Sequence, residues 1–299
     1  MAVLCIAPVA LASCSGVQSQ PGETAGALPP AAREATNEAS LYLSNVRTND
    51  VDIYSYPAGR MVGKLTGFGK PRSECTDAQG DVWIADPVAL AILEYAPGTK
   101  APIAALSTPG APNGCSVSPV NGDLAVTGGH NGVVVAVFHR SAHNHWRDQH
   151  DFTDTAMRVG YFCGYDPRGN LFVDGLSTKR NGSFRLAELP HRATALVDVA
   201  VKQQIAMPGQ VQWDGRHIAI GDSGVKPSVV YQFSIGGSGA KMVGATTLDG
   251  TTSVRQFWID GTSIIGPDFG KNVGVWNYPQ GGARTKTIDV TGFGAAVSK

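Results

Sequence analysis

The sequence carries little charge and no excess of either sign. Only 16% of its 299 residues are charged, and 24 basic residues balance 24 acidic ones. Because nucleic-acid-binding proteins usually show a strongly basic stretch or face, this composition predicts no nucleic acid partner. The sequence also lacks a Gly-x-Ser-x-Gly nucleophile elbow, a Walker phosphate loop and a dinucleotide-binding fingerprint. Three large classes of enzyme site are therefore not indicated.

The most apolar run of the chain lies at its N-terminus. Residues 1–13 are uncharged and too short to span a membrane, and they resemble the apolar core of a secretion signal. The run ends in Leu11-Ala12-Ser13-Cys14, which resembles a bacterial lipobox, the motif whose cysteine becomes lipidated. No Lys or Arg precedes the run, so a plain secretory signal or an ordinary apolar N-terminus are the alternatives.

These features predict three parts of the chain. Residues 1–14 are expected to be a signal peptide with a lipobox, with lipidation at Cys14. Residues 15–40 are small, polar and proline-containing, which is typical of a flexible linker. Residues 41–299 are expected to form the folded domain. The protein would then be exported to the periplasm or cell envelope and held at the membrane by its lipid.

Glycine (37) and proline (18) are abundant, which is typical of many short elements joined by tight turns. The heptapeptide Gly-Asp-Val-Trp-Ile-Ala-Asp at residues 80–86 recurs along the chain. Related segments follow at spacings of 42, 47, 46 and 46 residues, beginning at Gly122, Gly169, Gly215 and Gly261. A copy without the glycine covers residues 41–45.

Each copy sits between a preceding short strand with a turn and a following apolar run, and a weaker fourth strand comes after that run. Four-stranded units repeated at this period are typical of β-propeller blades. The chain begins with the second strand of a unit, and residues 292–298 resemble the lead into an innermost strand at Gly67-Phe68-Gly69. We therefore predict an all-β six-bladed β-propeller with four antiparallel strands per blade, closed by pairing of the C-terminal strand with the N-terminal blade.

The repeated phrase resembles NHL-type six-bladed propellers, and in particular uncharacterised bacterial exported or lipoprotein propellers. This resemblance covers roughly residues 40–299. A more distant resemblance is to the senescence-marker/gluconolactonase-like propellers, which hold a divalent cation through Glu, Asn and Asp. The resemblance implies the fold but not one function, because this architecture hosts lactonases, lyases, sensors and protein-binding platforms.

Second strands end, and innermost strands begin, at the same end of each blade. Their residues should surround one mouth of the central channel, which is the default place for a ligand. The candidates there are Arg72, Glu74, Asp86, Asn113, Tyr161, Asp174, Gln210, Asp222, Arg255 and Asp268.

Carboxylates around one mouth could hold Ca²⁺ or Mg²⁺ through oxygen ligands, with Glu74 and Asp86 as the metal candidates. The gluconolactonase resemblance implies that Glu74 and Asn113 stand for ligands of that family. For each single aspartate we favour the alternative that a carboxylate at a strand end caps a turn by accepting backbone N–H groups.

A second candidate metal site lies in the histidine-rich segment of residues 139–154. Five of the seven histidines fall within residues 130–150. Imidazole and carboxylate are ligands for transition metals, and the candidates are His143, His145, Asp148, His150 and Asp151. The repeat places residues 139–145 in a loop at the opposite end from the mouth, so an ordinary exposed loop is the favoured interpretation.

Three cysteines fall within the predicted domain. Cys115 and Cys163 occupy the same position of successive innermost strands, whereas Cys75 is offset by one residue. Because side chains alternate between the faces of a strand, a disulfide between Cys75 and Cys115 is allowed. The alternative is three small buried thiols.

Taken together, the sequence favours a binding or scaffold module whose mouth takes a small polar molecule, a glycan or a peptide of a partner protein. The alternative is an enzyme with its site at the same mouth, either a metal-dependent lactonase-type hydrolase or a propeller lyase.

Overall fold

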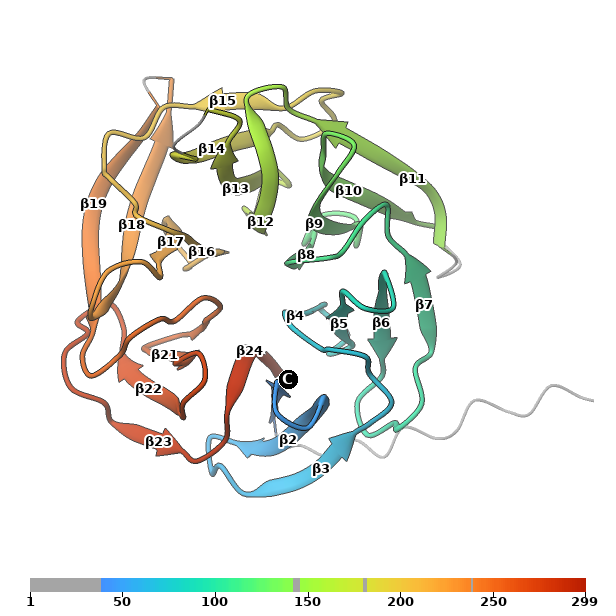
Figure 1. Ribbon diagram of the computed structural model, residues 1–299, viewed down its shortest axis with the longest axis vertical. Helices are drawn as coiled ribbons and strands as arrows, with labels where there is room; N and C mark the ends of the chain where they lie inside the picture. The colour runs from blue at the N-terminus through green and yellow to red at the C-terminus, as the bar shows by residue number, and fades with distance from the viewer. Residues whose placement is uncertain (1–38, 142–145, 180–181, 238) are drawn as a thin grey trace, which may run out of the picture. The chain divides into compact units, whose positions relative to one another are not determined.

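The computed structural model describes residues 39–299 except 142–145, 180–181 and 238. Its 24 strands form six four-stranded antiparallel sheets, arranged in a ring like the blades of a propeller (Figure 1). The predicted six-bladed architecture is confirmed. The predicted signal peptide, Cys14 and most of the linker lie outside the described residues. Within the described ranges, no helix has the length and apolarity needed to cross a membrane.

The blades follow the chain in order. Blade 1 contains β24 (Gly292–Ser298), β1 (Ala39–Asn45), β2 (Asp50–Tyr56) and β3 (Met61–Leu65). Blade 2 contains β4 (Glu74–Thr76), β5 (Val82–Asp86), β6 (Ala91–Tyr95) and β7 (Ala104–Ser107). Blade 3 contains β8 (Cys115–Val117), β9 (Leu124–His130), β10 (Val133–Arg140) and β11 (Trp146–Thr153).

The remaining three blades have the same pattern. Blade 4 contains β12 (Met157–Tyr165), β13 (Leu171–Ser177), β14 (Phe184–Leu189) and β15 (Val197–Val199). Blade 5 contains β16 (Pro208–Trp213), β17 (Ile218–Asp222), β18 (Ser228–Gly236) and β19 (Gly239–Leu248). Blade 6 contains β20 (Trp258–Asp260), β21 (Ser263–Pro267), β22 (Val273–Asn277) and β23 (Lys286–Ile288).

The repeated glycines mark the turns between first and second strands. The backbone φ angle is +82° at Gly80 and +74° at Gly122, a region that glycine enters at little cost. The second strands that follow are packed on both faces by neighbouring blades, and every residue of β5 and β13 is buried. The outer strands β3 and β7 are largely exposed or half-buried. Burial on both faces explains why the second strands read as apolar runs rather than as alternating ones.

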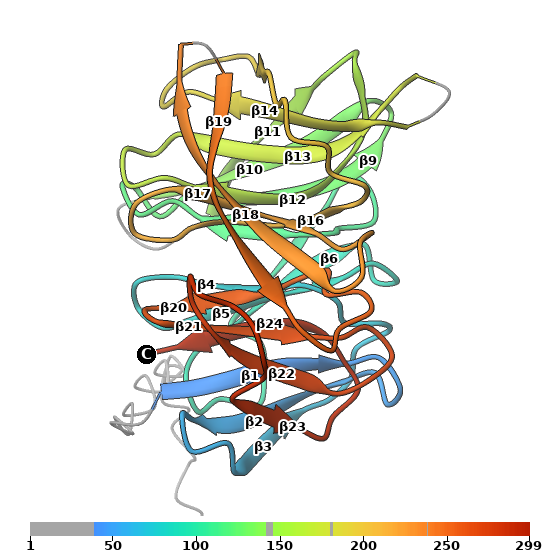
Figure 2. The same ribbon diagram turned by 90° about the vertical axis from the view of Figure 1, so that its left-hand side faces the viewer.

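The C-terminal strand closes the ring. β24 pairs antiparallel with β1, with Leu41 opposite Val297 and Leu43 opposite Ala295 (Figure 2). All seven residues of β24 are buried. The predicted closure is therefore confirmed, and it provides hydrogen-bond partners for a sheet edge that would otherwise be open.

A disulfide joins the innermost strands of blades 2 and 3. Cys75 in β4 and Cys115 in β8 are bonded, with 5.8 Å between their Cα atoms, and Cys163 is a buried free thiol. The bond lies in the inner layer of the ring, where β4 and β8 face each other across the blade boundary.

Reduction of this disulfide should lower stability. A closed loop of 40 residues corresponds to roughly 3–4 kcal/mol of unfolding free energy in the chain-entropy description. We expect reductant to lower the melting temperature of the wild type measured by calorimetry. The Cys75→Ala/Cys115→Ala variant should melt at the same temperature with and without reductant, and a wild type insensitive to reductant would contradict the structural role of the bond.

Candidate ligand-binding mouth

The mouth is the end of the ring at which β5, β17 and β21 finish and from which the innermost strands start. Arg72, Asn113 and Arg255 lie in the loops that lead into β4, β8 and β20. In blades 4 and 5 the innermost strands begin earlier than the sequence predicted, so Tyr161 lies inside β12 and Gln210 inside β16.

Three of the predicted aspartates hold loops rather than face the ligand space. The Asp86 carboxylate accepts hydrogen bonds from the backbone N–H groups of Gly69 at 2.6 Å and Lys70 at 3.0 Å. Asp222 accepts from Ala206 at 2.9 Å and Met207 at 3.1 Å. All three aspartates are buried, and the third, Asp268, accepts from Thr252 and Ser253 in the same way. Each carboxylate therefore fixes the loop that enters the innermost strand of its own blade.

Asp174 differs from these three, and its predicted place at a strand end is wrong. Strand β13 continues to Ser177, and Asp174 pairs within the sheet with Leu186. Asp174 lies one position earlier than Asp86 in the repeat, so its side chain points to the opposite face of the strand. Its carboxylate accepts from the backbone N–H of Phe162 at 2.8 Å, and complete burial raises its pKa well above the usual value.

Glu74 also does not line the mouth. It is fully buried, it accepts a hydrogen bond from the Ser44 hydroxyl, and burial raises its pKa well above the usual value. The side-chain amide of Gln256 binds the Glu74 backbone twice, accepting from its N–H at 3.1 Å and donating to its C=O at 2.5 Å. These bonds connect blade 6 to blade 2 past the C-terminal strand. They give Glu74 a role in holding the ring together.

Gly294 in β24 makes this connection possible. A Cβ atom at this position would overlap Glu74 Oε2, the Arg72 carbonyl and Gln256 Oε1. The same side-chain bridge occurs one blade earlier, where Gln212 donates to the Ile259 carbonyl at 3.0 Å and accepts from its N–H at 2.8 Å. Glutamine side chains therefore connect the innermost strands of blades 5, 6 and 2.

Two arginines and two phenylalanines lie together at the mouth, where Arg255 and Phe269 are exposed, Arg72 is half-buried and Phe293 is buried. The Arg255 guanidinium lies 4.4 Å from the ring centroid of Phe269 and 6.0 Å from that of Phe293, and the two rings meet edge to face. The Arg72 guanidinium lies 5.8 Å from the Phe293 ring and contacts Asn113 Oδ1 at 3.4 Å. Burial and the positive charge of Arg255 lower the pKa of Arg72. Neither arginine forms an ion pair with any carboxylate in the described part of the chain.

The two phenylalanines of this group were not predicted from the sequence. Phe269 lies two residues after the end of β21 at Pro267, and Phe293 lies in the C-terminal strand. The similarity of the segments at Phe293 and Phe68 indicated an innermost strand, but not that the Phe293 ring contacts Arg72 and Arg255. Tyr161 and Gln210 are present near this end but are engaged through their backbones, with the Tyr161 carbonyl accepting from Thr127 at 2.8 Å.

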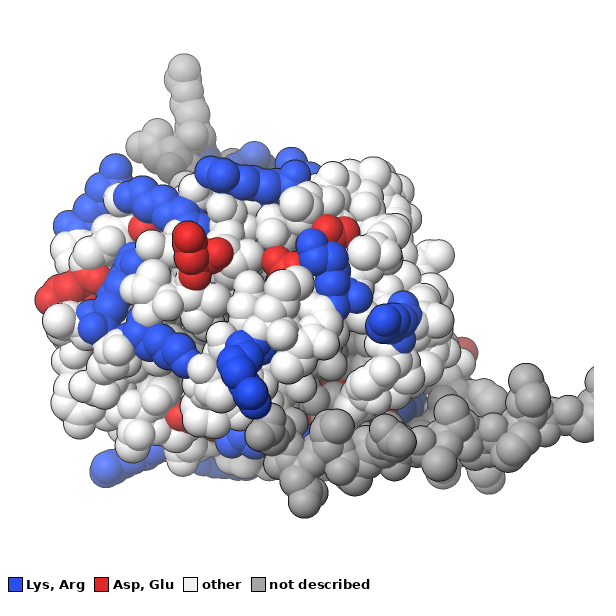
Figure 3. All heavy atoms as spheres, turned by 90° about the horizontal axis from the view of Figure 1, so that it is seen from below, with Lys and Arg blue, Asp and Glu red and all other residues white. Residues whose placement is uncertain are grey.

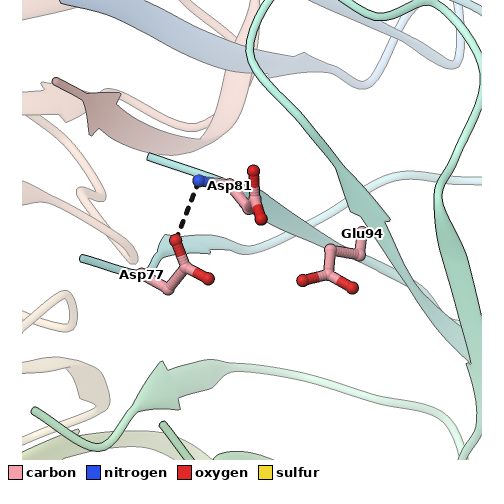
Figure 4. Close-up of side chains that lie close together, drawn as sticks. All are labelled: Asp77, Asp81 and Glu94. Carbon is pink, nitrogen blue, oxygen red and sulfur yellow. Dashed lines mark hydrogen bonds between the residues drawn. The ribbon is translucent and has the colours of Figure 1, made fainter. Parts of the chain in front are cut away.

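A cluster of acids lies at the opposite end of the ring, which we call the base. Carboxylate oxygens of Asp77, Asp81 and Glu94 lie within 4.8 Å of one another (Figure 4). Arg140 enters this cluster, with its guanidinium 2.9 Å from Asp77 and 3.3 Å from Glu94. The cation that balances the cluster is thus a side chain of blade 3, which links it to blade 2. Among the described residues, this is the one cluster of acidic, histidine or cysteine side chains spaced closely enough to hold a metal ion. It does not lie at the mouth.

Glu94 should make stability depend on pH. Burial raises its pKa to about 7, although Arg140 acts in the opposite direction. Between pH 4.5 and 7 the unfolded chain would lose this proton while the folded chain keeps it, so stability should fall by about 2–3 kcal/mol as pH rises through this window. We expect denaturant melts of Glu94→Gln to show a smaller fall than the wild type over the same range. Equal slopes for the two proteins would contradict this assignment.

The histidine-rich segment is only partly described. His143 and His145 lie outside the described residues, whereas Asp148, His150 and Asp151 belong to the outer strand β11. His139 Nδ1 lies 2.8 Å from Asp123, and its ring meets that of His150 edge to face. His139 and His150 therefore lie on the outer strands of blade 3, away from the mouth.

Comparison with known proteins supports the fold alone. No protein-family model matches the chain, and no curated protein matches its sequence. Among solved structures, a chain of the nidogen/laminin complex matches with a TM-score of 0.69 and 13% identity, covering 87% of this chain and 98% of that one. A protein of unknown function from Bacteroides caccae matches with a TM-score of 0.65 and 10% identity over 88% and 99% of the two chains. The Cps50 (Swd1) β-propeller domain of Myceliophteria thermophila matches with a TM-score of 0.56 and 11% identity over 84% and 83%. These similarities show a shared β-propeller architecture.

Proposed function

We propose that this protein is a non-catalytic binding module whose mouth holds an anionic group of a ligand or partner protein. The observation that carries the proposal is the pair Arg72 and Arg255, which flank Phe293 without a carboxylate partner among the described residues. A carboxylate or phosphate placed between two guanidinium groups forms charge-assisted hydrogen bonds, and arginine geometry suits both groups.

The surroundings of the two arginines favour an anion over other ligands. Burial and, after it, the positive charge of Arg255 lower the pKa of Arg72, and a bound anion would offset both effects. Phe269 and Phe293 hold the guanidinium groups by cation–π contact. Basic side chains also occur singly elsewhere, as the scattered Lys and Arg residues on the rim in Figure 3 show. Arg140 and Arg284 also lie over aromatic rings, but each has a carboxylate partner, whereas Arg72 and Arg255 have none among the described residues.

A protein partner fits this proposal well. The nidogen/laminin structure that shares the fold is a complex of two proteins. An exported protein tethered through a lipid on Cys14 would present its propeller to partners at the cell envelope, and the mouth could then take an acidic segment of a protein, an acidic glycan or a small anion.

The structure gives no particular support to a metal-dependent hydrolase or a lyase at the mouth. Asp86, Asp222 and Asp268 are engaged by backbone N–H groups, and Glu74 is buried behind β24. Binding of Ca²⁺ or Mg²⁺ at these carboxylates would require several loops to release them. Elemental analysis of the purified protein before and after Asp86→Asn substitution checks this: a stoichiometric cation lost in the variant would favour the enzyme.

The proposal is tested by titrating the protein with fluorescein-labelled decaglutamate at low ionic strength and following anisotropy. We expect saturable binding that weakens about tenfold or more in Arg72→Ala/Arg255→Ala, because two charge-assisted contacts are lost. The matched control is Arg60→Ala/Lys100→Ala, which removes the same charge from exposed positions away from the mouth. Equal weakening in both variants would show non-specific charge attraction and would contradict the proposal.

A further inference from the structure

A hollow lies at the base, between blades 4 and 5. Its volume is about 650 Å³, within the usual range of roughly 300–1,000 Å³ for small-molecule sites. It exists because the outer strand of blade 4, β15, has only three residues, whereas β18 and β19 of blade 5 have nine and ten. The long β18–β19 hairpin runs past the short strand (Figures 1 and 2). The facing surfaces of the two blades are therefore left uncovered at this point.

The inner wall of this hollow is aromatic. Trp213, at the end of β16, is half-buried and lines the hollow together with the buried rings of Phe172 and Phe233. All three belong to one apolar cluster that joins blades 4 and 5. Packing against this cluster holds the indole in place while part of it remains accessible. A fixed, partly exposed tryptophan offers a flat surface on which an apolar ring face can lie.

Side chains of both charges line the hollow together with Trp213. Glu188 is half-buried, and Arg168 and Arg216 are exposed, and all three line the hollow. None of the three side chains has a hydrogen bond or ion pair with another described side chain. The Asp166 carboxylate, by contrast, accepts hydrogen bonds from the backbone N–H groups of Arg168 and Asn170. Burial and the nearby Asp166 charge raise the pKa of Glu188, and Arg168 acts in the opposite direction.

We propose that this hollow is a binding site for a neutral saccharide. A sugar ring presents an apolar face, which would stack on Trp213, and hydroxyl groups at its edge, which would donate to Glu188 and accept from Arg168 and Arg216. The volume accommodates a short oligosaccharide, and the opening along the rim lets the chain extend beyond it.

The charge distribution separates this site from the mouth. The hollow is lined by two arginines, Arg168 and Arg216, and by three acids. The acids are Asp166, Glu188 and Asp198, and Asp198 is paired with Arg185. These charges nearly balance, so the site has no net attraction for an anion. It lies at the opposite end of the ring from Arg72 and Arg255, and a ligand bound here leaves the mouth free.

The test is isothermal titration calorimetry of the full chain with cellohexaose, chitohexaose and maltohexaose, each at millimolar concentration. We expect saturable one-site binding of at least one of them. Trp213→Leu should weaken that binding at least tenfold, and Glu188→Ala should weaken it severalfold. The matched controls are Trp258→Leu, which removes a half-buried tryptophan from blade 6, and Asp249→Ala, which removes an exposed carboxylate.

Three outcomes would overturn the proposal: no binding of any of the three oligosaccharides, binding that survives Trp213→Leu, or equal loss in Trp213→Leu and Trp258→Leu. A melting curve for each variant separates loss of the site from loss of the fold. Decaglutamate binding provides the independent readout of the mouth. If it persists in Trp213→Leu while saccharide binding is lost, the two sites are separate, and failure of either proposal leaves the other standing.

Discussion

Removal of residues 292–299 should lower the melting temperature by more than about 10 °C, because it costs several kcal/mol of unfolding free energy in a domain of this size. The truncation deletes β24 and opens the hydrogen-bonding edge of β1. It also exposes an apolar cluster that contains Leu41, Leu43, Ile265 and Val273 from blades 1 and 6. Calorimetry or circular dichroism of the truncated protein checks this expectation.

The control for this truncation is removal of Lys299 alone. Lys299 is exposed and contributes a surface ion pair with Asp260, which contributes little to stability. We expect this shorter deletion to change the melting temperature by only a few degrees. If the full truncation behaved like the removal of Lys299, the ring would not depend on the C-terminal strand and the closure described here would be wrong.

Gly294→Ala should strongly destabilise the inner layer of the ring. The added methyl group would overlap Glu74 Oε2, the Arg72 carbonyl and Gln256 Oε1. The side chains of Glu74 and Gln256 are fully buried. Relieving the overlap requires β24 to move or the Gln256 bridge to break, and we expect a loss of about 3 kcal/mol. The free energy of unfolding from urea denaturation measures the loss.

Gly236→Ala is the matched control for Gly294→Ala. Gly236 ends strand β18, its φ angle is not positive, and a Cβ atom there would have no heavy atom within 4 Å. We expect its stability to stay within about 0.5 kcal/mol of the wild type. A Gly294→Ala protein as stable as Gly236→Ala would mean that Gln256 does not hold the ring through Glu74.

The fold could be predicted because each blade repeats the same turn and the same buried second strand. A glycine at positive φ, such as Gly80, starts the second strand, and a following strand such as β5 is buried on both faces, so the period is visible in the sequence. The unpaired ends of the chain then predicted the closure. The alternation of side chains along a strand also permitted a disulfide between Cys75 and Cys115, and the structure contains this bond.

The candidate site was less predictable, because strand ends give positions but not partners. Asp86 was placed at the right end of its blade, but only the three-dimensional structure shows that its carboxylate is used by Gly69 and Lys70. Asp174 was assigned to the same set although a shift of one residue turns it to the other face of its strand. Phe269 and Phe293 come from different blades, and nothing in the local sequence indicates that they meet at Arg255.

Nuclear magnetic resonance of the arginine side chains tests the central claim most directly. The claim is that Arg72 and Arg255 together bind an anion at the mouth. In a titration with citrate, we predict that the Nε–Hε signals of these two arginines shift together and saturate at the same concentration, with assignments from Arg72→Lys and Arg255→Lys. Exposed arginines such as Arg60 should shift little. Shifts spread evenly over the exposed arginines, with none specific to Arg72 and Arg255, would contradict the account.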